Sequence, residues 1–168
     1  MERILFPVFI DLMKYFLTKP TVSGEFGPES VIDHTVIPRT ISHVHFVFDH
    51  WPEDLVTSHP VFLASQRLTD ALIENQCSGF TTEPCKVEKS VWFQESDREQ
   101  GVNRDLPKFF RLMIGSDGKN DLMVIGMELI VSLKVKHLLD SFSCERVQFF
   151  PLNDIGLGGG PKFKFPDK

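Results

Sequence analysis

VFLASQRLTDAL at Val61–Leu72 and ELIVSLKVKHLL at Glu128–Leu139 decide the fold, because the first overlies the second when the chain is shifted from position 61 to position 128. Each segment begins as a short apolar strand, reaches a Ser, and continues with apolar side chains spaced three and four apart. That spacing is typical of a helix that buries one stripe against a sheet. The sequence therefore predicts a strand-helix-strand unit used twice, at about residues 60–87 and 127–152.

Identical residues recur at this same shift along the two segments and beyond them. They are Ser65 and Ser132, Leu72 and Leu139, Cys77 and Cys144, and Pro84 and Pro151. A Ser directly before an apolar helix accepts a hydrogen bond from a free N–H group of the first turn, so both serines are expected to be N-caps. Each extended run ends near a Pro, which lacks a backbone N–H and therefore favours the edge of a sheet. A small residue recurring after each helix is expected to be buried, which applies to both cysteines.

Length and composition favour one globular domain. The chain has 168 residues, of which 42% are hydrophobic and 24% are charged, close to the average for folded domains. We expect a single α+β domain over residues 1–155, with the duplicated unit packed on a mixed or antiparallel sheet. Residues 156–168, GLGGGPKFKFPDK, are rich in Gly and then basic, and we expect a flexible tail there.

Local patterns predict four further elements. Apolar side chains spaced three and four apart indicate an amphipathic helix over residues 4–17, which Pro7 and two charged residues make unsuitable as a signal peptide or a membrane span. Alternation over residues 42–49 predicts a strand. The polar run at residues 94–101 is expected to be an exposed loop, and residues 108–114 a strand.

Charge and cysteine content restrict the partners and the compartment. The formal net charge of -5 argues against general affinity for nucleic acid, which requires clustered Lys and Arg. Three cysteines, Cys77, Cys85 and Cys144, leave one thiol over in any disulfide scheme, which favours a reducing compartment. We therefore expect a cytoplasmic protein that binds neither nucleic acid nor membrane.

Only one group of residues invites a chemical interpretation. His43 and His45 share one face of the predicted strand, and Asp49 follows, so a small metal-dependent hydrolase is one alternative. No third ligand follows at a recognised spacing, and no serine stands in a G-x-S-x-G motif. We expect no catalytic centre, no metal and no cofactor.

Two acidic clusters are the candidate binding sites. One surrounds a Trp, and the other lies in the predicted polar loop. An aromatic anchor beside carboxylates suits a basic protein surface, although such runs are also common on surfaces that bind nothing. The candidate partner-binding residues are Asp49, Trp51, Glu53, Asp54, Glu95, Asp97 and Glu99.

The repeated segments VFLASQRLTDALIENQCSGFTTEPCKV and ELIVSLKVKHLLDSFSCERVQFFPL resemble an element of bacterial polymorphic-toxin immunity proteins of the Imm11-like families. HVHFVFDHWPEDLV and LPKFFRLMI resemble their neighbours, so the resemblance spans about residues 43–152. It implies a cytoplasmic protein, monomeric or weakly dimeric, that neutralises a co-encoded secreted toxin by tight binding, and it carries no catalytic residue. A regulatory adaptor domain with another protein partner is a further alternative that the sequence leaves open.

Overall fold

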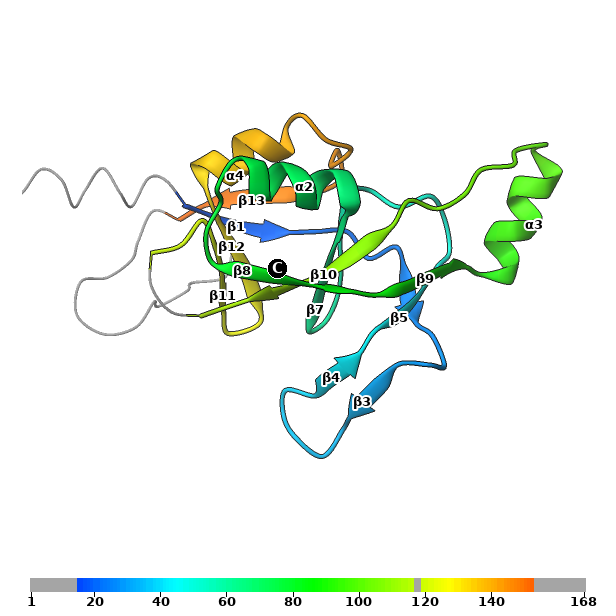
Figure 1. The fold of residues 1–168 in the computed structure, drawn as a ribbon, viewed down its shortest axis with the longest axis horizontal. Coiled ribbons are helices and arrows are strands. Elements are labelled where there is room, and N and C mark those ends of the chain that lie inside the picture. Colours follow the sequence, from blue (N-terminus) through cyan, green and yellow to red (C-terminus); the bar gives the residue numbers. More distant parts are fainter. Residues whose placement is uncertain (1–14, 117–118, 153–168) are drawn as a thin grey trace, which may run out of the picture.

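The computed structural model describes residues 15–116 and 119–152, which fold into a mixed α+β structure (Figure 1). Two four-stranded antiparallel sheets form its larger part. In the first sheet the order is β11 (Leu122–Ile125), β12 (Glu128–Ser132), β1 (Tyr15–Lys19) and β13 (Gln148–Pro151). In the second it is β6 (Leu55–Ser58), β7 (Val61–Ser65), β10 (Phe109–Ile114) and β8 (Phe80–Pro84).

Three helices and two smaller sheets complete the described part of the chain. The helices are α2 (Gln66–Glu74), α3 (Val91–Glu99) and α4 (Leu133–Leu139). A three-stranded sheet has the order β2 (Gly24–Phe26), β5 (His45–Phe48) and β9 (Lys86–Lys89), and a two-stranded sheet pairs β3 (Val31–Asp33) with β4 (Thr40–His43). Within the described ranges, no helix is long and apolar enough to cross a bilayer.

The two four-stranded sheets have the same strand order and the same register. Leu55 lies opposite Ala64 in β6 and β7, and Leu122 lies opposite Val131 in β11 and β12, so both partners move by the shift that takes 61 to 128. Both helices begin at the predicted serines, since Ser65 and Ser132 accept hydrogen bonds from the backbone N–H groups of Leu68 and Val135. As expected, β8 and β13 are edge strands that end at a Pro.

Each sheet receives its third strand from the other half of the chain. β1 precedes the first hairpin in sequence but lies between β12 and β13, and β10 precedes the second hairpin but lies between β7 and β8. The registers match, because Phe16 lies opposite Pro151 as Phe110 lies opposite Pro84. The halves are therefore interlocked by an exchange of strands, and neither sheet is complete without both.

One apolar core joins the two sheets to helices α2 and α4, which lie together on one side of the molecule (Figure 1). Equivalent positions of the two halves contribute to it in pairs. These pairs are Leu55 and Leu122, Phe62 and Leu129, Leu68 and Val135, and Leu72 and Leu139. Since all eight side chains are at most 4% exposed, this core accounts for the strict apolar pattern of the two segments.

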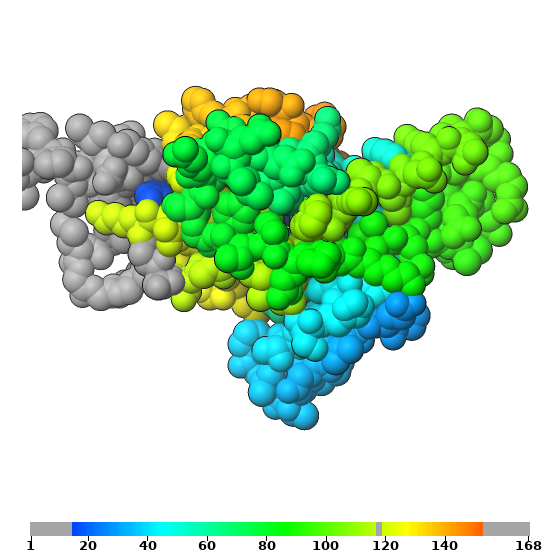
Figure 2. Space-filling model, viewed as in Figure 1, coloured from blue at the N-terminus to red at the C-terminus, as the bar shows by residue number. Residues whose placement is uncertain are grey.

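The elements without a counterpart in the other half form a lobe, defined here as β2, β3, β4, β5, β9 and α3. Its apolar side chains, among them Phe46, Phe48 and Phe93, pack in a second core against the outer face of β6, β7 and β10. Figure 2 shows the lobe protruding in two places, with α3 at one end of the molecule and the β3–β4 hairpin at its side.

Three sequence expectations need correction. Residues 15–17, expected at the end of a helix, begin strand β1, while the rest of the expected helix over 4–17 lies outside the described residues, as does the tail at 156–168. The expected strand at 42–49 is divided at Val44 into β4 and β5, which pair with different strands. Most of the expected loop at 94–101 belongs to helix α3, because its sequence offers Phe93 and Asp97 to the interior one turn apart.

Candidate functional site

Asp54 lies inside the molecule, and its expected place on an exposed acidic cluster is wrong. Its side chain is 6% exposed and accepts hydrogen bonds from the Ser65 hydroxyl, from the Arg67 guanidinium and from the Ser143 N–H at 2.8 Å. Burial alone would raise the pKa of Asp54, but these hydrogen bonds outweigh burial and the pKa is lowered. Asp54 thus joins the start of α2 to the segment after α4.

The other half of the chain contains the equivalent junction. Asp121 accepts hydrogen bonds from the Ser132 hydroxyl at 2.7 Å and from the Ser78 N–H at 3.0 Å, and its carboxylate lies 3.7 Å from the Lys134 ammonium. Burial again opposes these contacts, but the pKa of Asp121 is lowered. In both halves, therefore, an Asp joins the N-cap of one helix to a segment of the other half of the chain.

Glu53 is also an internal residue, contrary to expectation. It is 5% exposed, and its carboxylate accepts hydrogen bonds from the Arg146 N–H at 2.9 Å and from the Arg146 Nε at 3.1 Å. The Thr21 hydroxyl donates a third hydrogen bond at 3.3 Å. Glu53 therefore ties the start of the lobe to the last turn before β13.

Asp97 faces the lobe interior from α3 and is not an exposed loop residue. Its side chain is 9% exposed and lies 2.6 Å from the Lys89 ammonium, with the Arg104 guanidinium at 3.7 Å. Arg104 in turn lies over the Trp51 ring, 4.1 Å from its centre, and leaves Trp51 37% exposed. Two of the residues expected to bind a partner, Asp97 and Trp51, are thus linked to each other through Arg104.

The remaining predicted residues, Asp49, Glu95 and Glu99, are exposed. Helix α3, which carries Glu95 and Glu99, also exposes two apolar side chains that the sequence did not predict at the surface, Trp92 at 78% exposure and Val91 at 67%. We call these five residues the α3 surface.

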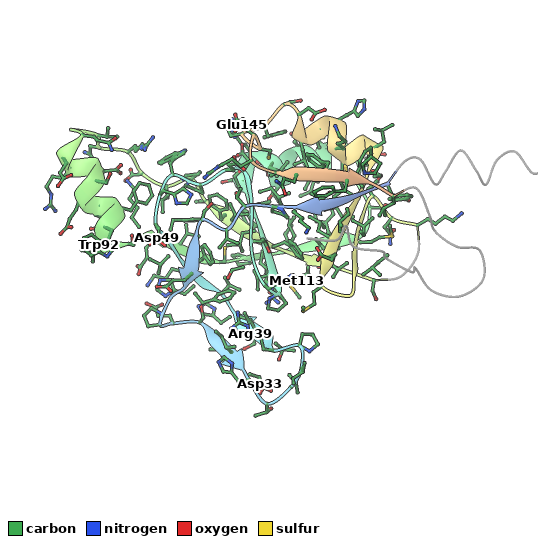
Figure 3. All side chains as sticks on the ribbon, turned by 180° about the vertical axis from the view of Figure 1, so that it is seen from behind. Asp33, Arg39, Asp49, Trp92, Met113 and Glu145 are labelled. Atoms are coloured by element: carbon green, nitrogen blue, oxygen red, sulfur yellow. The ribbon has the colours of Figure 1, made fainter. Side chains whose placement is uncertain are left out.

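Local structure explains why the α3 surface forms. Ser90 caps α3, since its hydroxyl accepts a hydrogen bond from the Phe93 N–H at 3.1 Å, and Phe93 then turns inward and Trp92 outward. The Ser90 N–H donates to the Phe48 carbonyl at 2.8 Å, which places Asp49 beside the start of the helix. Figure 3 shows Trp92 and Asp49 at the same end of the molecule.

The charged side chains near Trp92 lie along the exposed side of α3. Glu95 and Glu99 follow Trp92 at three and seven positions and therefore share its side of the helix, and Arg98, three positions after Glu95, places one positive charge at the edge of the same exposed face. The nearby Lys89 ammonium forms an ion pair with Asp97 inside the lobe. An exposed indole thus lies on the same side of the helix as two carboxylates, an arrangement that the sequence predicts around Trp51.

The histidines do not meet as the hydrolase alternative requires. His45 is 1% exposed, with its Nδ1 accepting from the Glu29 N–H at 3.2 Å and its Nε2 at 3.0 Å from a Glu88 carboxylate oxygen. His43 belongs to another sheet and is exposed. Across residues 15–116 and 119–152, no three His, Cys, Asp or Glu side chains are placed to hold a metal ion.

The thiols are in surroundings that keep them protonated. Burial, together with the nearby Asp54 and Glu53 carboxylates, raises the pKa of Cys144 to about 12, and burial raises that of Cys85 to about 11. Burial also raises the pKa of Cys77. Cys144 is buried as expected, whereas Cys77, also expected to be buried, is half-buried, as is Cys85. The thiolate form needed for nucleophilic attack is therefore disfavoured at all three.

Comparison of the chain with protein-family models, with curated proteins and with solved structures gives no match. Function is therefore inferred from the geometry of the chain's own residues.

Proposed function

We propose that this chain is a bacterial immunity protein, a cytoplasmic monomer or weak homodimer that neutralises a co-encoded toxin by tight binding and has no catalytic role. The observation that carries the proposal is the α3 surface, where Trp92 is 78% exposed on a helix at the end of the molecule. A Trp so exposed presents a large apolar area to water, which a partner would bury on binding. Trp is also among the residues that dominate binding free energy at protein interfaces.

The partner suited to this surface is a basic protein. Glu95 and Glu99 on α3 and Asp49 beside it place carboxylates around the indole, and the whole chain has a net charge of -5. Opposite charge speeds encounter and selects the partner, while a buried aromatic ring slows dissociation. A toxin that acts on nucleic acid has a basic cleft. Such a cleft supplies both the opposite charge and a concave site in which the ring can be buried.

We further infer that the interlocked sheets are two copies of one duplicated unit and that the lobe is the addition that gives this protein its partner. The matching registers and the paired junctions at Asp54 and Asp121 support the duplication. The α3 surface belongs wholly to the part of the chain without a counterpart. A rigid symmetric core carrying a distinct lobe suits a scaffold with one recognition module.

Coexpression with the toxin encoded beside this gene tests the proposal. Wild-type protein should restore growth and copurify with the toxin domain as a one-to-one complex, with an affinity in the nanomolar range or tighter, since protection requires near-complete occupancy. Trp92→Ala, and separately the pair Glu95→Lys and Glu99→Lys, should weaken the complex and the protection. The matched controls are Ile73→Ala and Glu74→Lys on α2, whose side chains are also exposed.

Equal loss in the α2 and α3 variants would contradict the role given to the α3 surface. A stable complex without protection of growth would instead indicate a regulatory adaptor. If the wild-type chain neither binds the toxin nor protects growth, the immunity function is refuted.

A further inference from the structure

The β3–β4 hairpin forms a second projection of the lobe, separate from α3 (Figure 1). Ile32 lies opposite Ile41 and Asp33 opposite Thr40, and among the described strands these two pair with no other. Residues 34–39 connect them as a tip at the side of the molecule, and Figure 3 labels Asp33 and Arg39 at its two ends.

The tip exposes one apolar side chain almost completely to solvent. Ile37 is 99% exposed, Val36 next to it is 42% exposed, and Pro38 follows. Exposed aliphatic residues are common singly on surfaces, but an uncharged Val-Ile-Pro run at the end of a projecting hairpin concentrates them where a concave partner can enclose them.

Specific contacts hold the tip in one shape at both of its ends. On the β3 side the Asp33 carboxylate accepts hydrogen bonds from the Thr35 N–H at 2.8 Å and from the Thr35 hydroxyl at 2.6 Å. On the β4 side Arg39 donates to the His59 carbonyl at 2.9 Å, and its guanidinium lies 5.5 Å from the centre of the Phe26 ring.

The hairpin is also anchored from below. Ile41 is 3% exposed and belongs to the core of the lobe. Because these contacts restrain both ends of the tip, a partner that encloses Ile37 has less conformational entropy to remove, which favours affinity.

We propose that the hairpin tip is the second contact with the toxin and that Ile37 enters an apolar pocket in or beside the toxin's active-site cleft. This inference rests on the proposed immunity function. The two projections then have different tasks: the α3 surface attracts the basic rim, and the uncharged Val-Ile-Pro run of the tip fills the pocket. The structure favours a protein pocket over an anionic membrane, because the same lobe carries the Asp49, Glu95 and Glu99 carboxylates, which such a membrane repels.

Substitution at the tip tests this inference with little effect on folding, because a side chain that is 99% exposed contributes almost nothing to the core. The probe is the purified catalytic domain of the neighbouring toxin, titrated by calorimetry against the full chain. Ile37→Ala should weaken binding roughly 10- to 100-fold, as expected for truncating an enclosed hot-spot residue, and Ile37→Asp should weaken it further. Ile73→Ala and Ile73→Asp, at a position 57% exposed on α2, are the matched controls.

The outcomes separate this inference from the function on which it rests. If wild-type protein binds and protects while Ile37→Asp does both equally well, the hairpin contact is wrong and the immunity function stands. If wild-type protein neither binds nor protects, the immunity function falls and the hairpin contact falls with it. Sedimentation of the chain alone and with anionic vesicles completes the test: an Ile37-dependent dimer, or Ile37-dependent vesicle binding, would assign the tip to another occupant and overturn the proposal.

Discussion

Replacing Asp54 by Ala should destabilise the protein more than the same change at its counterpart Asp121. Asp54 accepts hydrogen bonds from the Ser65 hydroxyl and the Ser143 N–H, and its side chain is 6% exposed. Hydrogen bonds to a charged group contribute about 1.5 to 3 kcal/mol each. The side chain of Arg67 is 62% exposed, so water screens its ion pair with Asp54. We assign this ion pair about 0.5 kcal/mol. Because a loss above about 4 to 5 kcal/mol is exceptional for one substitution, we take the lower value for both hydrogen bonds, and the sum predicts a loss of about 3.5 kcal/mol.

Asp121 provides the matched comparison, because it makes the same kind of junction with more exposure. Its side chain is 20% exposed, and the Lys134 ammonium stands 3.7 Å away and is 48% exposed. When Asp121→Ala removes the carboxylate, water can therefore hydrogen-bond to more of the groups that it leaves. The free energy of unfolding is expected to fall by about 1 to 2 kcal/mol.

Urea unfolding followed by far-ultraviolet circular dichroism measures both losses. With an m value of about 2 kcal/mol per M, the midpoint should fall by about 1.5 to 2 M for Asp54→Ala and by about 0.5 to 1 M for Asp121→Ala. Equal midpoints for the two variants, or a lower midpoint for Asp121→Ala, would refute the argument from burial.

Three further outcomes follow from the same structure. Because the pKa values of Asp54 and Asp121 are lowered on folding, their stabilising effect is complete above the unfolded value of about 4 and is lost as pH falls through the folded values, which acid titration of the urea midpoint measures. Cys85 and Cys144, with pKa values raised to about 11 and about 12, should resist a thiol reagent at pH 8 until the protein unfolds, and rapid labelling of native protein would contradict this. Leu63→Ala, at a fully buried position beneath the lobe, should lower the free energy of unfolding by about 2 to 5 kcal/mol, and a loss below 1 kcal/mol would show that the lobe does not pack there.

The sequence predicts the helices at Ser65 and Ser132 correctly because their signals are local. A capping Ser and apolar spacing over two turns act within a dozen residues and need no knowledge of the rest of the chain. The edge position of the strands ending at Pro84 and Pro151 is predicted for the same reason, since a missing N–H is a property of the residue itself.

The exchange of strands lies beyond this kind of reasoning. β1 and β10 pair with strands far away in sequence, and nothing in the apolar pattern of Tyr15–Lys19 distinguishes its partners from those nearer in the chain. The first three of these residues, 15–17, are expected in a helix from the sequence, because a run of apolar side chains satisfies both periods over so short a length. Pairing across the core decided the outcome.

Acidic composition alone misplaces part of the candidate site. Glu53, Asp54 and Asp97 were expected at the surface because carboxylates are seldom buried, yet each has a basic partner brought to it by the fold. Trp92 escaped notice although Ser90 precedes it as Ser65 precedes α2, and that capping signal was available. Which of the aromatic residues after a cap faces water depends on the core that Phe93 enters, which is a tertiary property.

Hydrogen exchange of the purified complex with the neighbouring toxin domain tests the central claim, that recognition belongs to the lobe, most directly. Slower exchange on binding should appear in α3, at residues 91–99, and in the hairpin tip, at residues 34–39, while the exposed sides of α2 and α4 keep the rates of the free protein. Protection concentrated on α2 and α4, with unchanged rates in α3 and the hairpin, would contradict the account and assign binding to the symmetric core.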